Sequence, residues 1–117
     1  MTKTFNLLIV DDNARMRSTI RSMLSQLPVD AMAECGTGAD AVAVYEQLRP
    51  DWVLMDVAMP ELDGISATRR IRALDPNAKV IIVTDFADAA LERAAADAGA
   101  VAYVRKDNLL SILEIIS

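Results

Sequence analysis

Short apolar runs recur along the chain and predict the strands of a sheet. Each run is too short for a helix, and most are rich in β-branched or aromatic residues, as buried strands are. The four clear runs cover residues 5–10, 52–55, 80–83 and 101–104. A weaker second strand is expected over residues 32–35.

Stretches with helical periodicity separate these runs. In the first stretch, apolar residues return every three or four positions along one face: Met16, Ile20, Met23, Leu24 and Leu27. Further helices are predicted over residues 39–48, 65–74, 87–98 and 109–116. Pro50 and Pro76 stop two of them, and Gly99 closes a third. Apolar strands that alternate with helices indicate a parallel sheet covered on both faces. We expect one α/β domain over residues 1–117, with a five-stranded parallel sheet and helices on both faces.

The last predicted helix carries more apolar residues than a single buried stripe needs. Four of them cluster on a helical wheel: Leu109, Ile112, Leu113 and Ile116. Leu110 and Ile115 fall on the flanks of this cluster. Two interpretations stay open, a generously apolar core helix or a contact surface for a partner or a continuing chain.

Composition narrows the classes of function. With 117 residues and a net charge of −5, the chain lacks the clustered Lys and Arg that bind nucleic acid or anionic membranes. It has no histidine, which excludes histidine-based catalysis and a phosphohistidine of its own. The single cysteine, Cys35, cannot form an internal disulfide and is expected to be buried. Because no apolar stretch could span a bilayer and no signal-peptide pattern opens the chain, we expect a cytoplasmic protein.

Polar residues that can carry chemistry stand at the ends of the predicted strands. In chain order they are Asp11 and Asp12, Asp56, Thr84 and Lys106. Because open parallel sheets bind ligands outside the carboxyl ends of their strands, we expect these side chains to gather at one edge. Three carboxylates at one edge repel one another unless a cation lies among them, and hard oxygen ligands suit Mg²⁺ or Mn²⁺. A divalent metal ion is therefore expected.

Phosphoryl transfer is the chemistry that such a site predicts. A metal ion held by two or three carboxylates keeps coordination positions for water and for a phosphate oxygen. One of the aspartates can then attack phosphorus to give an acyl phosphate, while Lys106 stabilises the phosphoryl oxygens. Taken singly, each residue fits an ordinary structural role, such as a helix cap for Asp12 or a local turn bond for Thr84. Their joint occurrence at the strand ends favours a site.

The chain resembles the receiver domain of bacterial two-component response regulators along essentially its whole length. The resemblance rests on Leu-Leu-Ile-Val-Asp-Asp at residues 7–12, on Met59-Pro60 and Gly64 after Asp56, and on Lys106. It implies a flavodoxin-like (βα)5 fold of the chemotaxis-regulator type. It also implies phosphorylation by a sensor histidine kinase or a histidine phosphotransfer protein, and a possible homodimer after phosphorylation. A receiver is a phosphoacceptor rather than an enzyme that acts on a separate substrate.

The same resemblance implies a role for each residue. Asp56 is the expected phosphorylation site, and Lys106 is expected to contact the phosphoryl group. The expected ligands of Mg²⁺ are Asp11, Asp12, Asp56 and the carbonyl of Ala58. Thr84 matches the family's switch hydroxyl, and Tyr103, three residues before the lysine, matches its switch aromatic. A phosphoryl group adds about −1.5 to −2 charges, which is expected to draw the hydroxyl inward and to remodel the output face.

Two residues depart from the family's usual pattern. Asp85 stands directly after Thr84, where the family usually keeps a small residue, and it either repels an anionic phosphodonor or turns into solvent. Asp107 follows Lys106 where many receivers have a cis proline, so we expect a trans bond here. The Lys-Asp pair also resembles the branch of the family that precedes a helix-turn-helix DNA-binding domain. Such a domain would begin beyond Ser117 and would regulate transcription.

Three other classes of protein can be compared with the residues at the strand ends. A haloacid-dehalogenase-type enzyme needs an Asp-x-Asp pattern after the first strand, which Asp11-Asp12-Asn13 does not provide. A nucleotide-binding domain needs a glycine-rich turn there, and the sequence is Asp-Asp-Asn-Ala-Arg. A receiver that has lost phosphorylation and acts as a protein-interaction module is supported only by Asp85.

Overall fold

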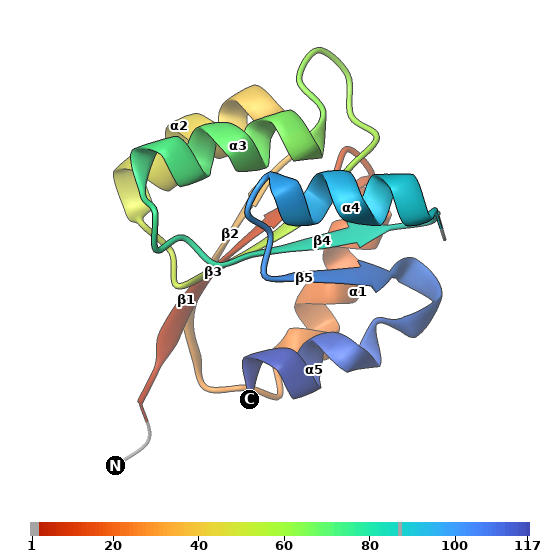
Figure 1. The fold of residues 1–117 in the computed structure, drawn as a ribbon. Coiled ribbons are helices and arrows are strands. Elements are labelled where there is room, and N and C mark those ends of the chain that lie inside the picture. The colour runs from red at the N-terminus through yellow and green to blue at the C-terminus, as the bar shows by residue number, and fades with distance from the viewer. Residues whose placement is uncertain (1–2, 87) are drawn as a thin grey trace.

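The sheet is continuous and parallel in the computed structural model, which describes residues 3–86 and 88–117. Its strands lie in the order β2-β1-β3-β4-β5 (Figure 1). They are β1 (Phe5–Val10), β2 (Val29–Cys35), β3 (Trp52–Asp56), β4 (Val80–Thr84) and β5 (Ala102–Arg105). The predicted α/β fold with five parallel strands is confirmed.

Several strand boundaries differ from the predicted ones. β2 begins three residues earlier, at Val29, because it is an edge strand whose exposed positions break the apolar pattern. β3 and β4 each extend by one residue, so Asp56 and Thr84 end their strands rather than follow them. β5 lies one residue later than the predicted span of 101–104.

Helices connect the strands and cover the sheet. They are α1 (Ala14–Leu24), α2 (Gly38–Leu48), α3 (Gly64–Leu74), α4 (Ala89–Asp97) and α5 (Leu110–Ile116). α1 ends before Leu27, whose N–H bonds to the Leu24 carbonyl in a turn. The side chain of Asp88 accepts hydrogen bonds from the first N–H groups of α4 and so sets its start; the predicted start, residue 87, lies outside the described residues.

The core lies on both faces of the sheet, which explains strands that are apolar throughout. In β1, Leu8 and Val10 belong to the cluster under α2, α3 and α4, whereas Leu7 and Ile9 belong to the cluster under α1 and α5. Figure 1 shows these two groups of helices on opposite sides of the sheet. Cys35 is buried, as predicted.

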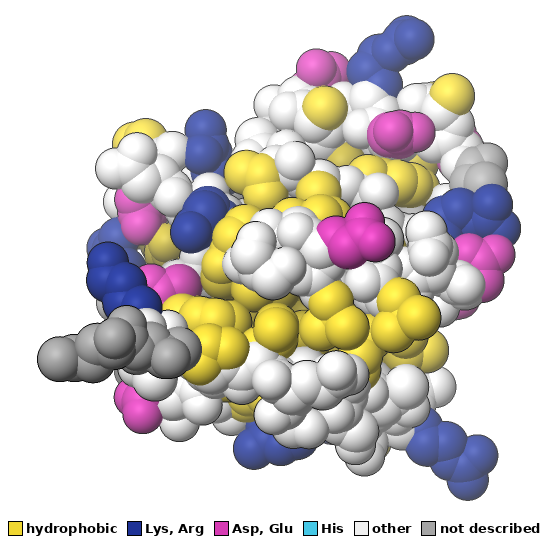
Figure 2. Space-filling model, turned by 90° about the horizontal axis from the view of Figure 1, so that it is seen from below, with side chains coloured by type: hydrophobic (Ala, Val, Ile, Leu, Met, Phe, Trp, Pro, Cys, Tyr) yellow, Lys and Arg dark blue, Asp and Glu magenta, His cyan; other side chains and the backbone are white. Residues whose placement is uncertain are grey.

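The last helix is only partly absorbed into the core. Ile112 is fully buried and Ile115 packs at the edge of the same cluster, but 66% of Leu110 is exposed. A band of hydrophobic side chains crosses the face seen from below in Figure 2, on the side of the sheet that α1 and α5 cover. In the described part of the chain, no helix has the length and apolar character that crossing a membrane requires.

Candidate functional site

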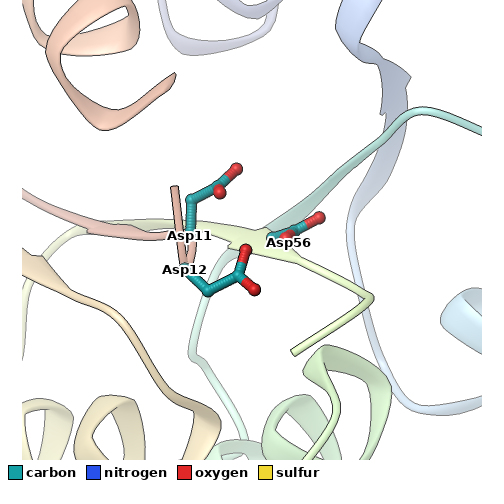
Figure 3. A group of neighbouring side chains, drawn as sticks. All are labelled: Asp11, Asp12 and Asp56. Atoms are coloured by element: carbon teal, nitrogen blue, oxygen red, sulfur yellow. The ribbon is translucent and has the colours of Figure 1, made fainter. Parts of the chain in front are cut away.

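The carboxyl ends of β1 and β3 bring three carboxylates together. The strand register pairs Val10 with Met55, which sets Asp11 and Asp12 beside Asp56. One carboxylate oxygen from each of the three lies within 4.8 Å of the others (Figure 3). Asp11 and Asp56 are buried, whereas Asp12 is exposed. The structure therefore gathers at one sheet edge the acids that the sequence singled out.

Lys106 approaches this cluster from the end of β5, which lies on the other side of β3 from β1. It opens a short 3-10 turn, Lys106–Asn108, directly after β5. Its Nζ lies 2.8 Å from Oδ2 of Asp11 and 3.3 Å from Oδ1 of Asp56, and only 10% of its side chain is exposed. The peptide bonds of the described residues are all trans, including the bond from Lys106 to Asp107, as predicted.

Burial and mutual repulsion perturb the charges in the cluster. Burial, with the nearby charge of Asp11, raises the pKa of Asp56 to about 6, although Lys106 and the N–H of Val57 oppose the shift. Burial disfavours the charged form of Lys106, but its hydrogen bond to Asp11 and the charges of both acids outweigh burial and raise its pKa. Lys106 therefore stays protonated, whereas the negative charge of Asp56 is only partly compensated by its surroundings.

The donor set fits a hard divalent cation. At neutral pH three carboxylates face one ammonium, which leaves about two negative charges uncompensated. Carboxylate oxygens at this spacing are the ligands that Mg²⁺ and Mn²⁺ prefer. Ala58, the fourth predicted ligand, is exposed and lies two residues beyond Asp56, between the buried residues Val57 and Met59.

Two glycines let the segment after β3 pack beside the site. The N–H of Gly64 donates to the Val57 carbonyl at 2.9 Å, and a Cβ at Gly64 would overlap the Asp56 carbonyl oxygen. A Cβ at Gly38, the first residue of α2, would overlap the carbonyl of Leu62. Gly64 was part of the sequence pattern, whereas nothing in the sequence indicated the role of Gly38.

Thr84 and Tyr103 both hydrogen-bond to the backbone of Phe86 rather than to Asp56. The Thr84 hydroxyl, at the end of β4, accepts a hydrogen bond from the N–H of Phe86 at 3.3 Å. The Tyr103 hydroxyl donates to the carbonyl of Phe86 at 2.7 Å. Among the described residues, neither hydroxyl is hydrogen-bonded to Asp56. Both predicted switch residues therefore hold the start of the segment between β4 and α4.

Asp85 lies between Thr84 and Phe86 in the sequence, and its side chain faces solvent. It is exposed, and its carboxylate forms no hydrogen bond or ion pair within residues 3–86 and 88–117. The side chain is thus free of the contacts that hold Asp11 and Asp56. Its predicted influence on an approaching anion stays a prediction.

The loop that carries Asp11 and Asp12 has an anchor that sequence reasoning missed. Nη1 of Arg17 donates to the carbonyl of Asp11 at 2.6 Å, and Nε of the same guanidinium donates to Glu34 on β2 at 3.0 Å. Asn13, not Asp12, caps α1 by accepting hydrogen bonds from the N–H groups of its first turn. The only sequence signal for the role of Arg17 was its position near the start of α1, close to the end of β1.

Comparison with known proteins decides the family. The sequence matches the response regulator receiver domain over residues 7–116. The chain belongs to this family. Chemotaxis protein CheY of Thermotoga maritima is 38% identical over 99 residues, which cover 85% of this chain and 82% of that protein.

Solved receiver structures have the same fold. A two-component response regulator of the LuxR family from Aurantimonas sp. SI85-9A1 matches with a TM-score of 0.86 at 33% identity, covering 97% of this chain and 85% of that one. The CheX–CheY–BeF3–Mg²⁺ complex from Borrelia burgdorferi gives a TM-score of 0.90 at 26% identity, covering 96% and 86%. The predicted membership and the flavodoxin-like fold are confirmed, and this receiver domain is part of phosphorylation-based two-component signalling.

Proposed function

We propose that this receiver domain is a phosphorylation switch in which Asp56 accepts a phosphoryl group from a phosphohistidine. The observation that carries the proposal is the placement of Asp56: buried, with a raised pKa, within 3.3 Å of the Lys106 ammonium and beside two further carboxylates. The donor must be another protein, a sensor histidine kinase or a histidine phosphotransfer protein, because this chain has no histidine.

In the transfer step, a carboxylate oxygen of Asp56 attacks phosphorus and forms the O–P bond of an acyl phosphate. The P–N bond of the donor breaks, and the imidazole leaves with the bonding electron pair. Asp56 must be ionised to attack, and a pKa of about 6 leaves it largely ionised at neutral pH while keeping it more basic than an ordinary aspartate. Lys106 donates to the phosphoryl oxygens as they gain charge.

Asp11, Asp12 and Asp56, with the carbonyl of Ala58, would hold Mg²⁺ or Mn²⁺. When bound, the ion supplies the positive charge that lets an anionic phosphodonor approach three carboxylates. Support comes from the spacing of the carboxylate oxygens and from the family, since the similar Borrelia structure is a complex with BeF3 and Mg²⁺. On this proposal the domain catalyses only its own phosphorylation and dephosphorylation and has no separate substrate.

The switch is proposed to work through Thr84 and Tyr103. A phosphoryl group on Asp56 would attract the buried Thr84 hydroxyl, which now accepts from the N–H of Phe86. The Tyr103 hydroxyl is hydrogen-bonded to the carbonyl of the same residue, Phe86, so a movement of the Phe86 backbone would also move the Tyr103 ring. The ring lines a groove of about 550 Å³ between α4, β5 and the start of α5. This groove is the surface that we expect to change.

The output is proposed to be regulation of transcription, carried out in the cytoplasm. Similar solved chains include a DNA-binding response regulator of the LuxR family from Staphylococcus aureus, at 28% identity and a TM-score of 0.88. The net charge of −5 makes direct DNA binding by this domain unfavourable, so DNA contact would fall to a further domain. Homodimerisation on phosphorylation stays a prediction.

Binding of BeF3⁻, a stable mimic of a phosphoryl group, tests the proposal. With Mg²⁺, it should raise the melting temperature of the wild-type domain by several degrees, because it binds only the folded state. The Asp56→Asn variant should show no such shift. A folded wild-type protein whose melting temperature ignores BeF3⁻ and Mg²⁺ would instead indicate the alternative, a phosphorylation-independent interaction module.

A further inference from the structure

We propose that Arg17 is a positioning residue that orients Asp12 for Mg²⁺ by clamping the peptide group between Asp11 and Asp12. This inference rests on the proposed function, because it concerns the same acidic site. Arg17 touches neither the phosphoacceptor nor Lys106 in the described contacts. Its action would therefore be on the backbone that carries two of the metal ligands.

Asp11 is fixed at each of its polar atoms. Its N–H donates to the carbonyl of Cys35 at 3.1 Å, which continues the pairing of β1 with β2. Its carboxylate accepts from the N–H of Asn13 at 2.9 Å and from Lys106 at 2.8 Å. Its carbonyl accepts from Nη1 of Arg17 at 2.6 Å. Only the last of these bonds acts on the peptide group that leads to Asp12.

Because the peptide bond is planar, the hydrogen bond from Arg17 to the Asp11 carbonyl also restricts the position of Asp12. The Asp11 carbonyl and the Asp12 N–H lie in one rigid plane, so fixing the carbonyl oxygen fixes where the Cα of Asp12 can lie. Asp12 itself is exposed, and among the described residues its carboxylate has no hydrogen bond that would hold it. The region that its carboxylate can reach therefore depends on where the backbone places its Cα, rather than on contacts of the side chain.

The guanidinium is held so that it can act as a clamp. Its Nε donates to Oε1 of Glu34 on β2 at 3.0 Å, while Nη1 points at the Asp11 carbonyl. Oε2 of Glu34 is in turn held at 3.2 Å by Arg21. Only 21% of the Arg17 side chain is exposed. A planar guanidinium can serve both acceptors at once in a fixed geometry, which a lysine ammonium cannot.

Charge and position predict opposite effects of removing Arg17. A cation close to the metal ligands repels Mg²⁺, so deleting its charge alone should tighten Mg²⁺ binding. Loss of an interaction that orients a ligand weakens metal binding, typically by about 10- to 100-fold. The sign of the change in Mg²⁺ affinity therefore separates a positioning role from a purely electrostatic one.

The experiment measures the dissociation constant for Mg²⁺ by following backbone amide NMR signals of the site during titration with MgCl₂. Arg17→Met should bind Mg²⁺ about 10-fold more weakly than wild type. Arg17→Lys keeps the charge but not the planar guanidinium that donates to two acceptors at once, so it should also bind Mg²⁺ more weakly. Arg15→Met is the matched control, because Arg15 is an exposed arginine on the same helix whose side chain forms no hydrogen bond or ion pair within the described residues. Its affinity should stay unchanged or tighten slightly.

A second measurement excludes a merely structural effect. Because Arg17 does not contact the phosphoryl group, saturating Mg²⁺ should restore acetyl phosphate labelling of Arg17→Met to within about twofold of wild type. Glu34→Gln, which weakens the clamp without touching Asp11, should fall between wild type and Arg17→Met in Mg²⁺ affinity. Melting in EDTA verifies that each variant is folded.

Two outcomes would overturn the inference. One is an Arg17→Met variant that is folded and binds Mg²⁺ as tightly as wild type or more tightly. The other is a labelling defect that saturating Mg²⁺ does not correct. In either case a wild-type protein that still binds Mg²⁺ and is labelled leaves the proposed function standing, whereas a wild type that does neither removes the proposed function itself.

Discussion

The ammonium of Lys106 lies closer to the carboxylate of Asp11 than to that of Asp56, at 2.8 Å against 3.3 Å. In this structure the lysine thus compensates the charge of Asp11, a proposed metal ligand, as well as that of Asp56, the proposed phosphoacceptor. A cation bound among the three carboxylates would take over that task and leave Lys106 to the phosphoryl oxygens. On the proposed function, the contact between Lys106 and Asp11 would therefore link metal binding to phosphorylation of Asp56.

Replacing Lys106 should separate the two processes. In Lys106→Met the competing cation is gone, so the dissociation constant for Mg²⁺ should be unchanged or lower. The rate of labelling by acetyl phosphate should fall on the order of 100-fold, because one donor to the developing charge is lost. Titration with MgCl₂ and the initial rate of labelling measure the two effects. Labelling at the wild-type rate would show that Lys106 has no part in the transfer.

Gly64 should be intolerant of any side chain. A Cβ there would overlap the Asp56 carbonyl oxygen, a backbone atom that cannot move without shifting β3. Gly64→Ala should lower the free energy of unfolding by more than about 2 kcal/mol, as expected for a backbone clash in the core. Gly36→Ala is the matched control, because its Cβ would meet only the Arg17 side chain at 3.6 Å. Equal stabilities of the two variants in urea would refute the close packing.

Asp56 should make the stability of the metal-free domain depend on pH. Its pKa of about 6 in the folded state exceeds the ordinary value of 3.8. The stability that this carboxyl contributes is therefore fully present below about pH 4 and is lost as the pH rises through about 6. Asp56→Asn has no such loss, so in EDTA its stability relative to wild type should increase by about 1–3 kcal/mol between pH 4 and pH 7.

Asp63 provides a control with the opposite sign. Burial works against its ionised form, but hydrogen bonds from Ser66 at the start of α3 outweigh burial and lower its pKa. Its contribution is thus present above its ordinary pKa and is lost as the pH falls. Asp63→Ala should therefore lose more stability at pH 7 than at pH 3. Urea unfolding over this pH range measures both variants, and a constant difference between Asp56→Asn and wild type would contradict the assignment.

Asp85 should slow phosphorylation by charge alone. Because its carboxylate is exposed and separate from the site's hydrogen bonds, it can repel an anionic donor but cannot block the pocket by a fixed contact. Asp85→Ala should speed labelling by acetyl phosphate about two- to threefold at low salt, and the difference should vanish at high salt. An unchanged rate at low salt would remove the only sequence feature that favours a phosphorylation-independent receiver.

Much of the fold follows from the sequence because β1, β3 and β4 are buried on both faces and read as continuous apolar runs. β2 was predicted too short because the exposed residues Asp30 and Ala31 near the start of this edge strand break that pattern. Leu110 shows a second limit of the apolar pattern. Its apolar character alone does not tell whether the side chain packs in the core or is exposed, and in the structure it is exposed.

The site was predictable where it depends on strand ends and not where it depends on loop paths. Asp11, Asp56 and Lys106 converge because the parallel strands of one sheet all end at the same edge. The bond from Arg17 to the Asp11 carbonyl and the close approach of Gly38 to Leu62 involve backbone atoms, which are identical for every residue type. No pattern of side chains encodes which carbonyl will lie nearby.

The most direct test of the central claim is intact-mass spectrometry after incubation with acetyl phosphate and Mg²⁺, comparing wild type with Asp56→Asn. The account predicts a single phosphoryl adduct on the wild-type domain, which disappears when EDTA replaces Mg²⁺ and is absent from Asp56→Asn. An adduct that persists in Asp56→Asn, or a folded wild type that acquires none under conditions where it binds Mg²⁺, would contradict it.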